Sequence, residues 1–427
     1  MSKFMQFFSY ALGTGLAASL CSAQVCSEIN KLVPAWTASG DIVGRELVSD
    51  GQTMLVGAVG HDGAVSNSGL VAVYELQAGS WTYVQSVAPP AEAASSGFGD
   101  GLAVCGEWAL VGSPATGTGT PGSVHAYKRS GGAWTFVQSI TSPTPAADDR
   151  FGLRVAIERN RAVVAASGED GQRGAVYVLQ RTGDVWSIES RLSPGDANPG
   201  DILGTFGVAI DRDTVLATAA HHDSEGTNSG AVYAFERDDT GAWGFRQKIL
   251  ANDPTPEATF GSSLSMDNGR IAVGSNGVDA AYVFERSTCD GLWVQTHRID
   301  SGFLGGGKFG DYLSMKGDIL VVGVPTFDGL AGRADVLLRD PLTNTWARMT
   351  TLLPSDGAPG DQFGYGLCVL GGRVLAGAHR ADAPGLDGGA VYEFDLDLCR
   401  CPSDFDKSGF TDTDDFDAFV RAFEAGC

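Results

Sequence analysis

The end of the chain carries oxygen-bearing groups at a spacing that suits a metal ion. Counted from Asp404 as position 1, oxygen donors fall at positions 1, 3, 5, 7, 9 and 12: Asp404, Asp406, Ser408, Phe410 (through its backbone carbonyl), Asp412 and Asp415. Gly409 stands at position 6, where such a loop must turn sharply. Because Ca²⁺ prefers a shell of oxygen ligands in this order, the sequence predicts Ca²⁺ as a cofactor. The alternative is an acidic tail without fixed structure.

A short helix is expected directly after this loop. Apolar side chains recur there on one helical face: Phe416, Phe419, Val420 and Phe423. A loop and helix of this kind, with Asp at the twelfth position, resembles one EF-hand-like repeat of a type I dockerin. Dockerins carry two such repeats and this chain has one, and the resemblance implies a cell-surface or cohesin-like partner. We place this module at 400–427 and expect Cys401 and Cys427 to pair, because small modules need such staples.

Before this tail the chain is a repeat of roughly 50 residues. A Phe-Gly pair opens the units at Phe98, Phe151, Phe206, Phe260, Phe309 and Phe363, and Val43–Gly44 is a degenerate first copy. Each unit holds two alternating runs around a tight turn, a glycine-rich loop, a third run and a strand led by tryptophan. The tryptophans are Trp81, Trp134, Trp186, Trp243, Trp293 and Trp346. This pattern predicts an all-β, seven-bladed β-propeller of four-stranded antiparallel blades, starting near residues 43, 98, 151, 206, 260, 309 and 363.

The last unit lacks its tryptophan-led strand. A candidate stands at the other end of the chain, at about 25–34, and would complete the last blade and close the ring. Closure is favoured because an open ring would leave sheet edges exposed. The same alignment brings Cys26 to the start of the fourth strand and Cys399 to the end of the third, so we expect a Cys26–Cys399 disulfide.

The units resemble FG-GAP repeats, the family of the integrin α-chain propeller and of many secreted bacterial proteins. The resemblance covers about residues 26–399 and rests on the Phe-Gly pairs and on segments such as "VGSP" (111–114) and "AGAH" (376–379). Some integrin blades bind calcium between their first two strands. Here those connections are tight turns such as "CGEW" and "LGGR", which have no room for six or more oxygen ligands. Integrin-type calcium binding is therefore not expected in this propeller.

The longer loops of a propeller share one face, formed by the connections between strands two and three and between blades. A candidate ligand face lies there: His61, Asp62, Asp170, His222, Asp223, Asp328, His379 and Asp382. The alternative is that these residues are ordinary solvated loop residues. We also place His61, His221 and His379 at matching positions after the second strand, where the first and last blades could share a transition metal ion.

The start of the chain predicts export. Residues 1–23 combine Lys3, an apolar run and a small-residue cleavage site near Ala23, which is typical of a signal peptide. The propeller then covers 24–399. The expected location is secreted, periplasmic or at the cell surface, and no segment reads as membrane-spanning. A formal net charge of −22 argues against a nucleic-acid partner.

The recognised catalytic motifs, such as a Gly-x-Ser-x-Gly elbow or His-Glu-x-x-His, do not occur in the sequence. We therefore expect a non-enzymatic binding or adhesion protein whose partner is an extracellular protein or glycan. One alternative is a propeller hydrolase or lyase acting on extracellular polysaccharide. Another is a structural protein of the cell envelope.

Overall fold

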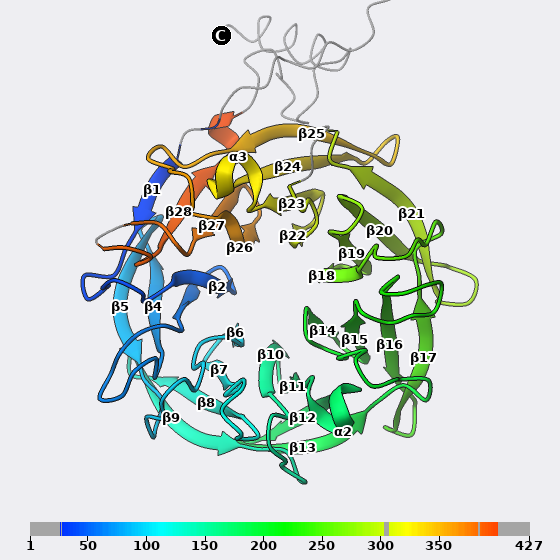
Figure 1. Cartoon of the computed structure of the whole chain (residues 1–427), viewed down its shortest axis with the longest axis horizontal. Helices are drawn as coiled ribbons and strands as arrows, with labels where there is room; N and C mark the ends of the chain where they lie inside the picture. The colour runs from blue at the N-terminus through cyan, green and yellow to red at the C-terminus, as the bar shows by residue number, and fades with distance from the viewer. Residues whose placement is uncertain (1–25, 27, 303–306, 383–384, 400–427) are drawn as a thin grey trace, which may run out of the picture.

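The computed structural model describes residues 26, 28–302, 307–382 and 385–399, except for the side chains of Leu398 and Cys399. In these residues, seven four-stranded antiparallel sheets surround a central axis (Figure 1). The predicted all-β, seven-bladed propeller is confirmed. The described part contains no helix long and apolar enough to cross a membrane.

The first four blades in chain order have the following strands: β2 (Val43–Ser49), β3 (Thr53–Ala58), β4 (Leu70–Gln77) and β5 (Ser80–Val87); β6 (Leu102–Cys105), β7 (Trp108–Ser113), β8 (Ser123–Ser130) and β9 (Ala133–Ile140); β10 (Phe151–Glu158), β11 (Arg161–Ala166), β12 (Ala175–Thr182) and β13 (Val185–Leu192); β14 (Val208–Asp211), β15 (Thr214–Ala219), β16 (Ala231–Arg237) and β17 (Trp243–Ile249). In each blade the first strand is innermost and the fourth is outermost.

The last three blades have these strands: β18 (Phe260–Asp267), β19 (Arg270–Ser275), β20 (Ala280–Arg286) and β21 (Trp293–Asp300); β22 (Tyr312–Lys316), β23 (Ile319–Val324), β24 (Arg333–Asp340) and β25 (Thr345–Leu352); β26 (Phe363–Leu370), β27 (Arg373–Ala378), β28 (Ala390–Asp395) and β1 (Glu28–Leu32). Two short helices, α2 (Glu169–Gln172) and α3 (Phe327–Leu330), lie in loops between second and third strands. A 3₁₀ turn, η1 (Leu396–Cys399), follows β28.

The second strand of each blade is almost wholly apolar because neighbouring blades cover both of its faces. All six residues of β3, β7 and β15 are buried. In the outermost strands β9 and β13, by contrast, only the tryptophan and the last residue are buried, because one face of the sheet is solvated there. The core is therefore divided into layers between adjacent blades.

The N-terminal strand completes the seventh blade, as the sequence predicted. β1 pairs antiparallel with β28, with Glu28 opposite Phe394 and Leu32 opposite Val391 (Figure 1). Cys26 is 2% exposed, and its Sγ lies 3.4 Å from Thr350 Oγ1. The side chain of Cys399 is outside the described residues, so the Cys26–Cys399 disulfide stays a prediction.

The Phe-Gly pairs contribute to packing within a blade, through the phenylalanine, and against the preceding blade, through the glycine. Phe151 is fully buried, and its ring meets Tyr177 of the same blade edge-on at 5.4 Å between centroids. Phe260 and Tyr282 repeat this contact at 5.4 Å. Gly152 has φ 98°, and a Cβ there would lie 2.4 Å from the Ser123 carbonyl oxygen, so a side chain would not fit.

The fourth blade departs from the predicted register. Leu203 N donates to Arg173 O at 3.0 Å, just as Phe151 N donates to Pro121 O at 2.9 Å, so Leu203 is the counterpart of Phe151. The predicted blade start at Phe206–Gly207 is therefore wrong by three residues, and Leu203–Gly204 stands in its place. One extra residue precedes β14, and it turns Phe206 toward the central channel, whose cavity it lines.

Several predictions concern residues at the two ends of the chain that the structure does not describe. The signal peptide (1–23) and the C-terminal module (400–427) lie outside the described residues. The calcium ligands from Asp404 to Asp415 and the Cys401–Cys427 pair therefore stay predictions.

Candidate functional site

A cavity of about 210 Å³ lies in the central channel and receives residues from all seven blades. One aliphatic residue per blade forms a belt around it: Leu47, Leu102, Val155, Val208, Leu264, Leu313 and Leu367. Each belt residue occupies the same place in its blade, because each pairs with the equivalent residue of the second strand. The apolar part of the cavity is therefore a direct product of the repeat.

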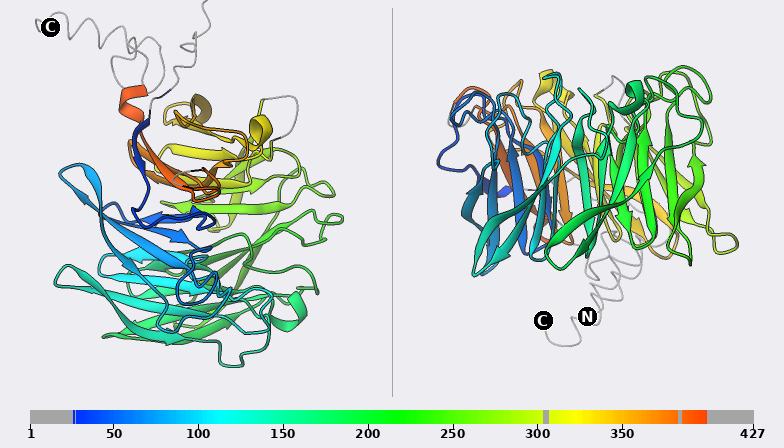
Figure 2. Two further views of the ribbon diagram at one scale, coloured as in Figure 1. Left: turned by 60° about the vertical axis from the view of Figure 1, so that its left-hand side comes forward. Right: turned by 90° about the horizontal axis from the view of Figure 1, so that it is seen from below.

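Polar side chains line the same cavity, and they do not repeat. Glu46, Arg154, Tyr312 and Tyr365 come from the first, third, sixth and seventh blades. They stand near the beginnings of the innermost strands, which follow the blade connectors. The polar part of the cavity thus lies toward the face that carries the longer loops, the face on which α2 and α3 lie in side view (Figure 2).

The charged groups at this mouth differ in their partners. Arg45 Nη1 lies 3.5 Å from Asp100 Oδ1, which joins the first and second blades. Arg154 Nη1 donates to two backbone carbonyls, Asp100 O at 3.3 Å and Leu153 O at 3.0 Å. Within the described part of the chain, Arg154 has no ion pair with a carboxylate, and the Glu46 carboxyl has neither a hydrogen bond nor an ion pair.

The surroundings shift the proton affinities of these groups. Burial raises the pKa of the Glu46 carboxyl above its ordinary value, and the guanidinium of Arg154 only partly opposes this. Burial lowers the pKa of Arg45, but Asp100 and the nearby tyrosines outweigh it, so this pKa lies above its ordinary value. Burial also raises the pKa of Tyr312. At neutral pH the mouth therefore holds the charged guanidinium of Arg45, the neutral phenol of Tyr312 and a carboxyl group, that of Glu46, that is costly to ionise.

Aromatic rings form one wall of the mouth. The rings of Tyr312 and Tyr365 lie 4.0 Å apart between centroids with an interplanar angle of 35°. His379 meets Tyr365 edge-on at 4.2 Å, is 5% exposed, and has a buried Nδ1 without a hydrogen-bond partner in the described structure. Burial, with Arg45 and Arg380 nearby, lowers the pKa of His379 to about 3, so this imidazole is neutral under ordinary conditions.

Most of the aspartates of the predicted ligand face help to form their own loops. Asp62 Oδ1 accepts from Asn67 N at 2.8 Å, and Asp223 Oδ1 accepts from Asn228 N at 2.7 Å. Asp382 Oδ1 repeats this with Asp387 N at 3.0 Å. Each of these carboxylates therefore accepts a hydrogen bond from the backbone five residues further along its own loop.

Two other predicted aspartates lie in the loops that form the short helices. Asp170 Oδ2 is 2.5 Å from Arg191 Nη2. Asp328 has φ 46° and is exposed in α3. The structure thus distributes the predicted aspartates over separate loops rather than bringing them together.

The predicted histidines fall in different surroundings. His61 and His222 occupy equivalent positions in their blades. The second strand ends at Ala58 in the first blade and at Ala219 in the fourth, and each histidine lies three residues after that end. The matching of His61 with His221 is therefore wrong, and His379 directly follows β27. His61 Nδ1 lies 3.3 Å from Asp41 Oδ1, and His222 Nδ1 lies 2.8 Å from Asp201 Oδ2.

Metal binding finds no support on the described propeller. Among the described residues, no three His, Cys, Asp or Glu side chains lie together in a way that could hold a metal ion. His379 packs against Tyr365 at the channel, whereas His61 packs against Trp36 at 5.0 Å. The two histidines thus have different neighbours.

The channel residues were missed by the sequence analysis, although a signal was present. In the six blades without the extra residue, the two positions after the opening pair read Arg45–Glu46, Asp100–Gly101, Leu153–Arg154, Ser262–Ser263, Asp311–Tyr312 and Tyr365–Gly366. The flanking residues repeat while these positions change from blade to blade. The site could therefore have been located by aligning the repeats and looking for positions whose residue type changes from blade to blade, and not by searching for a known motif.

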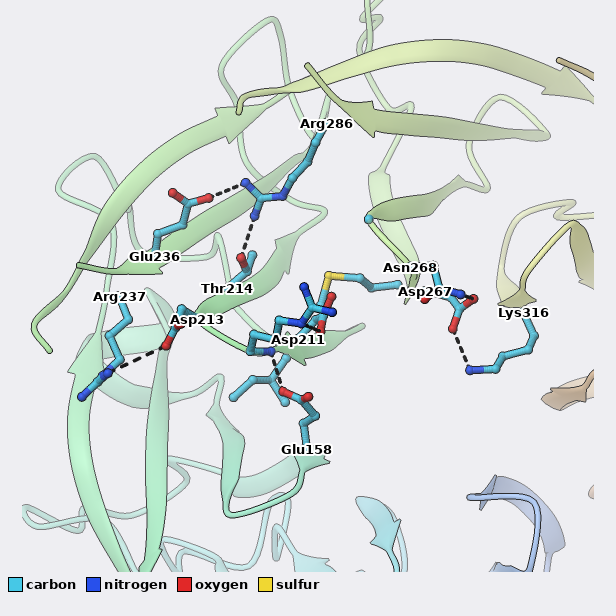
Figure 3. A pocket seen from close by; sticks show the side chains of 14 residues that line it. Glu158, Asp211, Asp213, Thr214, Glu236, Arg237, Asp267, Asn268, Arg286 and Lys316 are labelled. Atoms are coloured by element: carbon cyan, nitrogen blue, oxygen red, sulfur yellow. Dashed lines mark hydrogen bonds and ion pairs between the residues drawn. The ribbon is translucent and has the colours of Figure 1, made fainter. Parts of the chain in front are cut away.

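A second, wider pocket of about 710 Å³ lies on the opposite face, between short turns of the third to sixth blades (Figure 3). Its charges are largely paired with one another. Arg286 Nη1 is 2.6 Å from Glu236 Oε1, and Lys316 Nζ is 2.7 Å from Asp267 Oδ1. Because these partners already satisfy each other, the pocket offers fewer free groups to a ligand than the channel mouth.

Comparison with known proteins agrees with the fold. The model of the FG-GAP repeat matches residues 134–179, 186–235, 243–284 and 346–394. No curated protein matches the chain. Among solved structures, a putative 6-phosphogluconolactonase from Bacteroides uniformis is 13% identical with a TM-score of 0.52, over 76% of this chain and 88% of that one.

A second solved structure, the periplasmic gluconolactonase of Pseudomonas aeruginosa, is also 13% identical. It has a TM-score of 0.50, over 80% of this chain and 95% of that one. Identity this low shows a shared fold alone. The chain thus contains FG-GAP repeats and folds as a seven-bladed β-propeller.

Proposed function

We propose that the protein is an exported, non-enzymatic binding propeller that holds one unit of an extracellular glycan at the channel mouth on its loop-rich face. The observation that carries the proposal is the cavity to which all seven blades contribute, with polar groups where the repeat diverges. Long loops on a rigid scaffold are a usual place for recognition, and this mouth lies among them.

The chemistry of the mouth favours a sugar. Tyrosine rings offer apolar faces and hydroxyl groups, and Glu46 and Arg154 offer hydrogen-bonding groups that no other described side chain contacts by a hydrogen bond or ion pair. The volume of about 210 Å³ is below the roughly 300–1,000 Å³ of pockets for drug-sized ligands, so it suits a single ring. A flat protein surface would not enter such a cavity.

A glycan array probed with the mature full chain tests this function. Tyr365→Ala is expected to weaken the affinity for every glycan that binds by about tenfold or more, because the stacking ring and the hydroxyl group are lost together. Val294→Thr, on the exposed outer strand β21, is the matched control and should bind like the unaltered protein. An array without any bound glycan, or hits that Tyr365→Ala leaves unchanged, would contradict the proposal.

The proposal includes calcium binding by the C-terminal module. Its support is the order of oxygen donors from Asp404 to Asp415. Calorimetric titration of the mature full chain with Ca²⁺ should show binding that the double variant Asp404→Asn, Asp406→Asn loses. The absence of binding heat at millimolar Ca²⁺ would overturn the proposed calcium site but would not affect the proposed glycan binding at the channel mouth.

A second candidate function is hydrolysis of a sugar lactone in the same cavity. It is favoured by the raised pKa of Glu46 beside a guanidinium and by the names of two solved structures of similar fold, a putative 6-phosphogluconolactonase and a gluconolactonase. Hydrolysis of glucono-lactone releases gluconic acid, and the base needed to hold the pH constant can be followed by pH-stat. Turnover that falls about 100-fold or more in Glu46→Gln would favour the enzyme. A rate equal to spontaneous hydrolysis would exclude this substrate.

A further inference from the structure

Two ionisable side chains of the channel cavity, Arg154 and Glu46, form no hydrogen bond or ion pair with another side chain among the described residues. Within the described part of the chain, the guanidinium of Arg154 donates only to the backbone carbonyls of Asp100 and Leu153. The Glu46 carboxyl makes no hydrogen bond or ion pair among the described residues. Arg45, by contrast, already has Asp100 at 3.5 Å. Of the two guanidinium groups at the mouth, that of Arg154 is thus the one that no carboxylate contacts among the described residues.

A half-buried guanidinium favours an anion. Guanidinium and carboxylate form paired, charge-assisted hydrogen bonds, and these gain strength where water is partly excluded. The belt of aliphatic residues below Arg154 and the tyrosine pair both limit water at this place. The ligand is therefore expected to carry negative charge.

The charge of the site also limits the charge of the ligand. The carboxyl groups of Glu46 and Asp100 both lie at the mouth, and of the two guanidinium groups there only that of Arg154 has no carboxylate contact among the described residues. A phosphate with two negative charges would face these acids with too few cations. A single carboxylate matches the guanidinium of Arg154, while sugar hydroxyls can pair with Glu46.

We infer that the bound unit is an acidic sugar, whose carboxylate pairs with Arg154, whose ring packs against Tyr312 and Tyr365, and whose hydroxyls reach Glu46. This inference rests on the proposed glycan-binding function. The same chemistry is offered by a free sugar acid and by a uronic acid at the end of a polysaccharide.

Isothermal titration of the mature full chain with glucuronate and with glucose tests the inference, because these sugars differ only at the sixth carbon. Glucuronate should bind at least about tenfold more tightly than glucose. In Arg154→Gln the preference should fall to about onefold. Arg154→Lys keeps the charge but not the paired geometry, so it should show an intermediate preference and serves if Arg154→Gln fails to fold. Val294→Thr is the control and should keep the full preference.

The outcomes separate the inference from the proposed function. Equal affinity for the two sugars, or a preference that survives in Arg154→Gln, overturns the acidic-sugar assignment even if neutral glycans bind to the array. Loss of all glycan binding overturns both. Among positive results, tighter binding of a glucuronate oligomer than of the monomer assigns a polysaccharide end, and equal binding assigns a free sugar acid.

Discussion

The outer rim of the propeller and its channel mouth use the same repeat in opposite ways. On the outer side, Gln85 Nε2 donates to Trp134 O at 2.8 Å and its Oε1 accepts from Trp134 N at 2.9 Å. Gln138 holds Trp186 of the next blade in the same manner, and Gln247 holds Trp293. At the channel mouth, equivalent positions instead hold glutamate, glycine, arginine, serine or tyrosine.

The difference has a geometric origin. Every blade meets similar neighbours at its outer strands, so one solution serves repeatedly and the residues stay alike. All seven blades share one cavity at the axis, and a ligand there is not sevenfold symmetric. The blades are therefore expected to present different groups to it. Positions that keep the same residue type in the repeats build the ring. Equivalent positions whose residue type varies between blades are available for binding a ligand.

The largest effect is expected from the repeated core. Phe151→Ala removes a fully buried ring that contacts Tyr177, so the free energy of unfolding should fall by about 3–5 kcal/mol. Denaturant unfolding followed by tryptophan fluorescence measures this loss. Under native conditions the variant should keep its ligand, whereas a selective loss of binding in a folded variant would place function in the repeated positions.

The clamps between blades should matter less. Gln138→Ala deletes two hydrogen bonds to the backbone of Trp186, and we expect a loss of about 1–3 kcal/mol in the free energy of unfolding. Ser190 stands at the same position in the third blade and makes no side-chain hydrogen bond among the described residues. Ser190→Ala is therefore the matched control, expected within about 0.5 kcal/mol of the unaltered protein. Equal effects of the two changes would show that the clamp contributes nothing.

A pH effect should distinguish the channel wall from the rim. The folded pKa of His379, about 3, lies below its ordinary value of 6.5, so stability is full above 6.5 and is lost as pH falls toward 3. His379→Phe keeps the ring contact with Tyr365 but cannot titrate. Between pH 7 and 5 the unaltered protein should lose about 2 kcal/mol more than this variant. Parallel losses in denaturant unfolding at the two pH values would contradict a buried, neutral His379.

Much of the fold could be predicted because the repeat encodes it locally. Period-2 runs, tight turns and tryptophan positions give the strands, and the missing last strand pointed to β1. The error at Phe206 arose because a chance Phe-Gly pair lies three residues after the true Leu203–Gly204. A one-residue insertion is invisible to a dipeptide pattern, whereas backbone pairing with Arg173 reveals it.

The site was harder to predict for a physical reason. Glu46, Arg154 and Tyr365 are far apart in the sequence and meet only because the ring closes. The loop histidines and aspartates attracted attention because their residue types suit metals and acids. In the structure many of them bind their own loops, as Asp62 does with Asn67. Residue type alone could not separate these tasks.

Substitution of Glu46 should have the smallest effect on stability, and this effect should be a gain where the other substitutions cause losses. It is therefore the sharpest test of the contrast between the outer rim and the channel mouth. Burial raises the folded pKa of Glu46 above its ordinary value of 4.5, so ionising this carboxyl costs more in the folded state than in the unfolded chain. Stability is therefore unaffected well below pH 4.5 and is reduced as pH rises through the folded pKa.

Glu46→Gln removes that cost without changing the shape of the side chain. The variant should be more stable than the unaltered protein at pH 7, equal to it at pH 3.5, and weaker in ligand binding. Denaturant unfolding at both pH values, with sugar titration at pH 7, measures all three. A gain in stability with a loss of binding would mean that Glu46 is kept for recognition at the expense of stability, as residues of binding sites often are. A loss of stability at pH 7 would instead make Glu46 part of the scaffold, and the contrast between rim and channel would fail at its central residue.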